Sequence, residues 1–99
     1  MNPYRLLSDV ASDADIEAAF EWYESEHPGL GVEFIDEVGA AYERILDGSF
    51  KYQDLRSGIR RAITRRFPYG IYFTVEDHVI FIIAVLDTAR DPAEWQFRV

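Results

Sequence analysis

The amino-acid sequence predicts a two-layer α+β fold, in which a helical hairpin packs on an antiparallel β-sheet. Two observations support this fold class. In the first half of the chain, apolar residues recur at helical spacing in two segments that Pro28-Gly29 separates. The second half holds short runs rich in β-branched and aromatic residues, and residues 60–87 are the predicted sheet. With 99 residues, of which 48% are hydrophobic, we expect one domain over residues 1–99.

The first half is expected to form one short strand and two helices. Residues 4–7 are the strand. Asp13 is the expected N-cap of a first helix that ends near His27, because Pro and Gly follow it. A second helix is expected over residues 30–46, with an apolar stripe formed by Phe34, Val38, Ala41, Tyr42 and Ile45. The short connection between the helices predicts an antiparallel hairpin whose apolar face needs a sheet to cover it.

The second half is expected to form three strands. Residues 58–67 are the first, residues 71–75 the second and residues 79–86 the third. Pro68 marks a break or bend because it cannot donate to a strand ladder. The third strand is nearly all apolar, which favours an interior strand covered on both faces. Asp91-Pro92 would end the sheet before a short helical turn at residues 93–95, so the predicted order is β-α-α-β-β-β.

The charge is divided unevenly along the chain. The net charge is -8, but residues 1–55 hold 13 acidic and three basic residues, whereas residues 56–99 hold five acidic and seven basic residues. Nine of the ten basic residues are Arg, which suits bidentate contacts to carboxylates and phosphates. We therefore expect the Arg-rich first strand of the sheet to be the working surface.

Several function classes are disfavoured. The chain has no cysteine, which excludes a disulfide framework, a thiol nucleophile and a cysteine-ligated metal site. It has no P-loop, HExxH or GxSxG motif, so we expect no cofactor, metal or small-molecule substrate. No apolar run is long enough to span a membrane and no signal peptide is visible, so we expect a cytoplasmic protein.

Four segments together resemble the RelE/ParE superfamily, the toxins of type II toxin–antitoxin systems, also called plasmid stabilisation proteins. Their order and spacing, rather than any one of them, carry the resemblance over nearly the whole chain. The segments are Asp15-Ile16-Glu17-Ala18-Ala19 with Trp22-Tyr23-Glu24; Gly29-Leu30-Gly31 with Phe34; Arg60-Arg61 through Phe67-Pro68-Tyr69 to Tyr72; and Ala84-Val85-Leu86 with Arg90-Asp91-Pro92 and Trp95.

The resemblance implies the β-α-α-β-β-β toxin fold and a cognate antitoxin that wraps over the toxin and neutralises it. It also implies a choice of activities, because one branch inhibits DNA gyrase, another cuts mRNA on the ribosome, and some members are not toxic. The ParE-like branch, with gyrase as target, is favoured here, and an inhibitory binding protein is favoured over an enzyme. The alternatives are a ribosome-dependent mRNA endonuclease of the RelE kind and a non-toxic antitoxin-binding module.

Departures from the nuclease pattern support this choice. Gly70 stands where RelE-like nucleases commonly have Arg, and Phe97 lacks the hydroxyl of a C-terminal Tyr. Asp87 replaces a His that relatives often carry, and it could form an ion pair with Arg61, Arg65 or Arg90. The two histidines, His27 and His78, are expected to be solvent-exposed and away from the working face.

The predicted binding patch groups the arginines of the first strand with residues near it. Strand alternation sends Arg61 and Arg65 to one face and Arg60 and Arg66 to the other. The alternative is that these arginines pair with acids of the helical hairpin, such as Glu33 or Asp36. The patch comprises Arg60, Arg61, Arg65, Arg66, Tyr69 and Arg90, of which Arg61, Arg65 and Arg90 are also weak catalytic candidates. Tyr69, Tyr72 and Phe73 could stack on a partner or fill the core.

Overall fold

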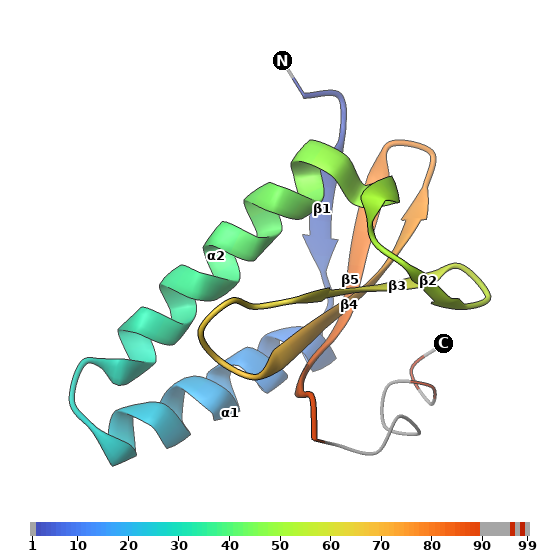
Figure 1. Cartoon of the computed structure of the whole chain (residues 1–99). Helices are drawn as coiled ribbons and strands as arrows, with labels where there is room; N and C mark the ends of the chain where they lie inside the picture. Colours follow the sequence, from blue (N-terminus) through green and yellow to red (C-terminus); the bar gives the residue numbers. More distant parts are fainter. Residues whose placement is uncertain (1, 90–95, 97, 99) are drawn as a thin grey trace.

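The computed structural model describes residues 2–89, 96 and 98, and it places two helices on one face of a five-stranded sheet (Figure 1). The α+β fold class is therefore confirmed. The elements are β1 (Arg5–Ser8), α1 (Val10–Glu26), α2 (Leu30–Gly48), a 3-10 turn η1 (Ser49–Lys51), β2 (Asp54–Arg56), β3 (Ile59–Ile63), β4 (Tyr69–Glu76) and β5 (Val79–Asp87). Arg90, Asp91-Pro92, the turn expected at residues 93–95, and Phe97 lie outside the described residues.

The strand order is β1-β5-β4-β3-β2. Two details of the predicted sheet are corrected. β1 joins the sheet parallel to β5, so the sheet is not antiparallel throughout. A further strand, β2, pairs antiparallel with β3 across a tight turn in which Ser57 and Gly58 both have positive φ. The sequence gives little sign of β2, because it has only three residues and two of them are charged.

The first helix begins four residues earlier than expected. Asp9, not Asp13, is the N-cap: its side chain accepts a hydrogen bond from the backbone N–H of Ser12, and its own backbone N–H donates to the Ser12 hydroxyl oxygen at 3.2 Å. This reciprocal capping box satisfies backbone groups that a helix start leaves unpaired. Ser12 is fully buried, and its Oγ also lies 3.2 Å from the carbonyl of Ile82 in β5. Ser12 thus also links α1 to the sheet.

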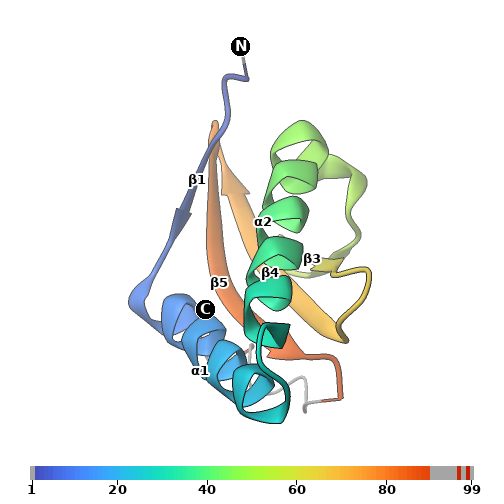
Figure 2. The same ribbon diagram turned by 90° about the vertical axis from the view of Figure 1, so that its left-hand side faces the viewer.

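The helical hairpin turns through Gly29, whose φ of 90° is the left-handed conformation that glycine adopts without strain. Two residues later the helices approach closely, since a Cβ on Gly31 would lie 2.7 Å from the backbone oxygen of Phe20. The backbone N–H of Gly31 donates to the Glu24 carboxylate at 2.8 Å. These contacts hold the two helices together at their connection, and Figure 2 shows the hairpin lying on one side of the sheet.

Apolar side chains fill both faces of the interior strands. The larger cluster lies between helices and sheet and includes Phe34, Ile45, Phe73, Ile80 and Ile82. The smaller cluster lies on the opposite side, here called the open face, and comprises Ile59, Tyr72, Ile83, Ala84 and Leu86. β5 contributes to both clusters, as expected for an interior strand. Neither helix within the described part of the chain is long and apolar enough to cross a membrane.

Candidate functional site

The two arginines that lie on β3 point to opposite faces, as the alternation predicts. Arg61 lies opposite Tyr72 in the ladder between β3 and β4, on the open face. Arg60 turns to the helix side, where its Nη1 donates to the carbonyl of Tyr52 at 2.5 Å and its guanidinium lies 5.2 Å from the ring centroid of Phe50. Arg60 is therefore engaged within the protein, while Arg61 is half-buried on the open face.

Arg65 and Arg66 were expected on the strand, and that expectation is wrong, because β3 ends at Ile63. Both lie in the exposed loop that joins β3 to β4, and their backbone N–H groups donate to the Glu37 carboxylate of α2 at 3.0 and 2.9 Å. The Arg66 guanidinium also pairs with Glu33, and this hydrogen bond raises the pKa of Arg66. The alternative, in which the arginines pair with acids of the helical hairpin, is confirmed for Arg66 and Glu33. The second acid that holds this loop is Glu37, which accepts from backbone N–H groups, and not Asp36.

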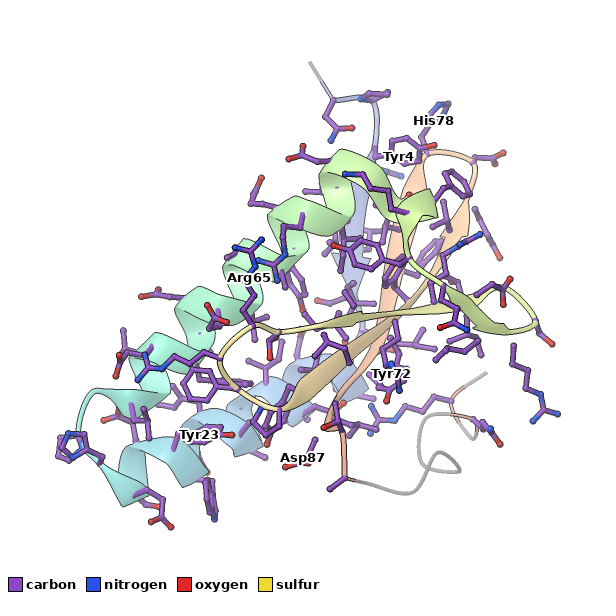
Figure 3. The ribbon with its side chains drawn as sticks, viewed as in Figure 1. Tyr4, Tyr23, Arg65, Tyr72, His78 and Asp87 are labelled. Carbon is purple, nitrogen blue, oxygen red and sulfur yellow. The ribbon has the colours of Figure 1, made fainter. Side chains whose placement is uncertain are left out.

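The aromatic residues considered for stacking are buried or partly buried. Tyr72 and Phe73 belong to the core, on the open face and the helix face respectively. Tyr69 is half-buried against the helices, with its ring centroid 4.9 Å from that of Phe34 and 6.1 Å from that of Tyr23. Figure 3 shows Arg65 well separated from Tyr72 and Asp87. The described members of the predicted patch are therefore divided among four places: the helix side of β3 (Arg60), the open face (Arg61), the loop after β3 (Arg65 and Arg66) and the packing surface against the helices (Tyr69).

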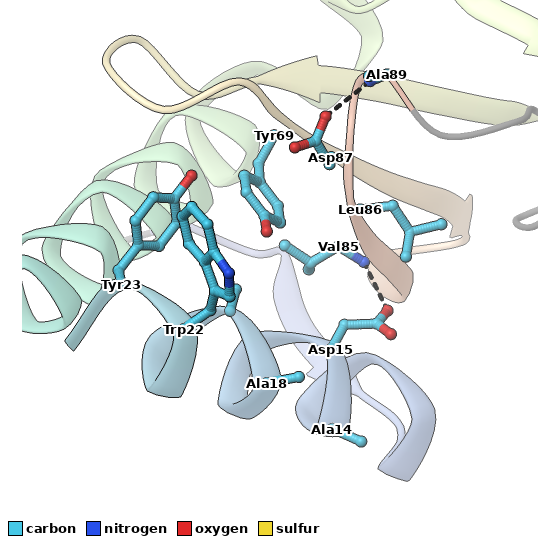
Figure 4. Close-up of a pocket in the computed structure, with 11 residues that line it drawn as sticks. Ala14, Asp15, Ala18, Trp22, Tyr23, Tyr69, Val85, Leu86, Asp87 and Ala89 are labelled. Carbon is cyan, nitrogen blue, oxygen red and sulfur yellow. Dashed lines mark hydrogen bonds between the residues drawn. The ribbon is translucent and has the colours of Figure 1, made fainter. Parts of the chain in front are cut away.

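The structure does form a groove that the sequence did not predict, between α1 and the ends of β4 and β5 (Figure 4). Its volume is about 590 Å³. One wall is the exposed side of α1, formed by Ala14, Ala18 and Trp22, and Trp22 is 58% exposed. The residues that line it are Ala14, Asp15, Ala18, Ala19, Trp22, Tyr23, Tyr69, Val85, Leu86, Asp87 and Ala89.

Two carboxylates give this apolar groove its charge. Asp87 accepts a hydrogen bond from the backbone N–H of Ala89 at 2.8 Å, and among residues 2–89 it forms no ion pair. Of the partners expected for Asp87, Arg61 and Arg65 form no ion pair with it, and Arg90 is outside the described residues. Burial raises the pKa of Tyr23, and the neighbouring Tyr69 and Asp87 raise it further. Tyr23 therefore stays protonated, and the Asp87 end of the groove suits a cationic group.

Asp15, at the other end, is already occupied. Its Oδ2 accepts from the backbone N–H of Val85 at 3.0 Å, and both its oxygens accept from the guanidinium of Arg98. Arg98 also donates to the carbonyl of Ile83 at 3.2 Å. Asp15 thus joins α1, β5 and the C-terminal Arg98. A sequence signal for this wall existed, because Ala14, Ala18 and Trp22 recur every four residues on one side of α1.

The histidines lie away from both regions. His27 is the exposed C-cap of α1. His78 is exposed in the turn between β4 and β5, with its ring 5.2 Å from that of Tyr4, and Figure 3 shows this pair far from Asp87. The expectation that both are solvent-exposed is confirmed. Among the described residues, no group of three or more acidic or His side chains could hold a metal ion.

A family model described as "ParE toxin of type II toxin-antitoxin system, parDE" matches residues 7–92. The chain belongs to this family of ParE toxins. A solved structure described as "Chromosomal ParDE TA system from P. aeruginosa" superposes with a TM-score of 0.75 at 16% identity, covering 86% of this chain and 96% of that one. This likeness confirms the ParE toxin fold. No curated protein matches the sequence.

Proposed function

We propose that this chain is the toxin of a type II toxin–antitoxin pair and that a cognate antitoxin binds and neutralises it in the cytoplasm. The free chain inhibits a macromolecular target by binding, and DNA gyrase is the first candidate. The observation that carries the proposal is membership of the ParE toxin family over residues 7–92. The likeness to a solved structure from a chromosomal ParDE toxin–antitoxin system agrees with it.

The surroundings of Gly70 support binding rather than RNA cleavage. RNA cleavage needs a general base and acid beside the substrate, and strong electrostatic contact with phosphates. A Cβ on Gly70 would lie 3.1 Å from the side chains of Arg61 and Tyr72, so a larger residue fits there only if they shift. This chain has Gly70 where RelE-like nucleases commonly have an arginine. His27 and His78, the two imidazoles of the chain, lie at a helix end and in a strand turn.

Two described residues of the predicted patch remain in the proposal as antitoxin contacts. Arg61 lies on the open face and Arg65 is exposed in the loop after β3, so both can meet an acidic antitoxin segment. Arg60 and Arg66 already have intramolecular partners, and Tyr69 is half-buried, so we expect these three to contribute less. Arg90 stays in the proposal on sequence grounds alone.

Controlled expression of the chain in a bacterium, with and without the reading frame beside its gene, tests the function. We expect growth arrest with DNA-damage signalling, relieved by co-expression of the neighbouring frame. Codon-phased mRNA cuts would instead establish the endonuclease alternative. Normal growth, together with tight binding to the neighbouring product, would establish the non-toxic module.

The antitoxin contacts need a separate measurement with the purified partner. We expect the double variant Arg61→Ala and Arg65→Ala to lower affinity for the antitoxin at least about tenfold, because two charged contacts are lost. The matched control is Arg56→Ala, which removes an exposed arginine from β2. Equal affinities for the double variant and the control would remove Arg61 and Arg65 from the account.

A further inference from the structure

We propose that the outer edge of β1 is a self-association surface, through which two copies of this chain join their sheets antiparallel about a twofold axis. β1 is the last strand at its end of the sheet, and no described strand or helix covers its outer side (Figure 2). An unpaired edge of this kind is a template for another strand. β1 contains no proline, lysine or bulge that would block such pairing.

The hydrogen bonds within the sheet define which backbone groups of β1 are available. The N–H of Arg5 donates to the carbonyl of His78 at 2.9 Å, and Arg5 and Leu7 pair with Val79 and Phe81 of β5. Along a strand, successive residues direct their backbone groups to opposite sides. The N–H and C=O groups of Leu6 and Ser8 therefore point away from the sheet. A second β1 strand can pair with these two residues.

Antiparallel pairing through Leu6 and Ser8 allows two short registers. In one, Leu6 faces Leu6 of the second copy, and Arg5 faces the second copy's Leu7. In the other, Leu6 faces Ser8, Leu7 faces Leu7 at the axis, and Arg5 faces Asp9. The second register brings opposite charges together twice, once on each side of the axis, and opposite-charge cross-strand pairs are stabilising.

The charges are suited to this role. Arg5 is exposed and forms no ion pair with any other described residue. Asp9 is still extended, with φ -102° and ψ 176°, so it keeps the alternation of the strand and shares a face with Arg5 and Leu7. One of its oxygens caps α1 through Ser12, which leaves the other for a cation. We therefore assign the register that pairs Arg5 with Asp9.

Apolar exposure is found at the same edge. Leu7 is 43% exposed and Val10, which follows Asp9, is 85% exposed. On the open face, Leu7 and Asp9 line a shallow depression with Thr74, Phe81 and Ile83. In the assigned register, Leu7 would pack against its own copy at a position where side chains approach most closely. The four residues of β1 and the Asp9 that follows them thus combine outward-pointing backbone groups, self-complementary charge and apolar contact at one edge.

A cysteine substitution tests the register directly, because the chain has no cysteine of its own. The assigned register places the two Leu7 Cα atoms about 4.5 Å apart, within the range of a disulfide. We expect Leu7→Cys to form a disulfide-linked dimer under mild oxidation. Ile63→Cys is the matched control, since Ile63 on β3 is 46% exposed and should remain monomeric. Equal cross-linking at both positions, or none at Leu7→Cys, would overturn the proposal.

Sedimentation equilibrium of the unmodified 99-residue chain supplies the second test. We expect a reversible monomer–dimer equilibrium that Asp9→Asn weakens about fivefold in low salt, because two exposed ion pairs are lost while Asn keeps the helix cap. Arg5→Asp should weaken it further by placing like charges opposite each other. Circular dichroism confirms that these variants fold. A chain that stays monomeric at several hundred micromolar, or dimerises equally in all variants, contradicts the assignment.

Discussion

Removal of the Asp15 carboxylate should destabilise the protein more than removal of any exposed acid on the helices. In the native structure this side chain is 12% exposed and receives three hydrogen bonds, one from the backbone of Val85 and two from Arg98. The variant Asp15→Ala leaves the Val85 N–H without its acceptor. It also deprives the Arg98 guanidinium, which is 25% exposed, of this carboxylate, although the contact with the carbonyl of Ile83 remains.

The expected loss follows from those two effects. A buried donor left without an acceptor costs about 1–3 kcal/mol. The lost ion pair adds roughly 1 kcal/mol, a discounted value because the guanidinium is partly solvated. We therefore expect Asp15→Ala to lower the free energy of unfolding by about 2–4 kcal/mol, a large share of the roughly 5–15 kcal/mol that holds a domain folded. For a chain of this size, that loss lowers Tm by roughly 10–20 °C.

Urea unfolding followed by circular dichroism measures this effect. Asp15→Asn should lose only about half as much, because its amide oxygen can still accept from the Val85 N–H. Arg98→Ala should lose about 1 kcal/mol, and the double variant less than the sum of the two single losses. Asp36→Ala, at an exposed acid of α2, should stay within about 0.5 kcal/mol. If Asp15→Ala behaved like Asp36→Ala, Asp15 would not be the link between α1, β5 and Arg98.

Three further predictions concern the helices and their attachment to the sheet. Gly31→Ala should lower the free energy of unfolding by about 1–3 kcal/mol, because its Cβ would meet the Phe20 carbonyl. Gly39→Ala should raise it by about 0.5–1 kcal/mol, since a Cβ there meets nothing within 4 Å. Urea titrations that gave both variants the same change in stability would contradict the close approach of the helices at Gly31. Ser12→Ala should cost about 1–2 kcal/mol, because it removes the hydroxyl that accepts from the Asp9 backbone N–H and that contacts β5, while the Asp9 side chain still caps residue 12. Thermal melts no lower than wild type would refute that role. Tyr42→Phe should raise stability by about 1 kcal/mol at neutral pH, because the buried Tyr42 hydroxyl has no hydrogen-bond partner among the described residues. Burial, with smaller contributions from Asp13 and Asp15, raises the Tyr42 pKa to about 12, so folding favours the protonated phenol. Wild type should therefore lose about 2 kcal/mol more stability than Tyr42→Phe between pH 10 and pH 12; parallel pH profiles would contradict this.

Elements with strong periodicity could be predicted from the sequence, and elements set by single contacts could not. α2 and β5 carry long apolar patterns, and both lie within two residues of their expected bounds. β3 was expected to continue to residue 67, because alternation persists through its arginines. It ends early because the backbone N–H groups of Arg65 and Arg66 donate to the Glu37 carboxylate of α2. No local pattern reveals such a contact between distant parts of the chain.

The site was harder to predict than the fold for a similar reason. Composition draws attention to the arginines, but the surfaces they occupy depend on where β3 ends. The groove beside α1 needs Trp22 and Asp87 brought together by tertiary packing. The bulge in β5, where the pairing shifts between Ala84 and Ile82, also changes which side chains after it face the helices. An apolar strand conceals such a shift, since every residue suits either face.

The parallel pairing of β1 with β5 has a consequence for the timing of folding. Residue 5 pairs with residue 79, so β1 can pair with β5 only after residue 79 has been made. Contacts between distant residues carry a loop-closure cost and slow folding. On the ribosome, the helical hairpin can form early from local contacts, but it has no completed sheet to cover until β5 emerges. A nascent chain interrupted before residue 79 therefore lacks β5 and cannot complete the sheet.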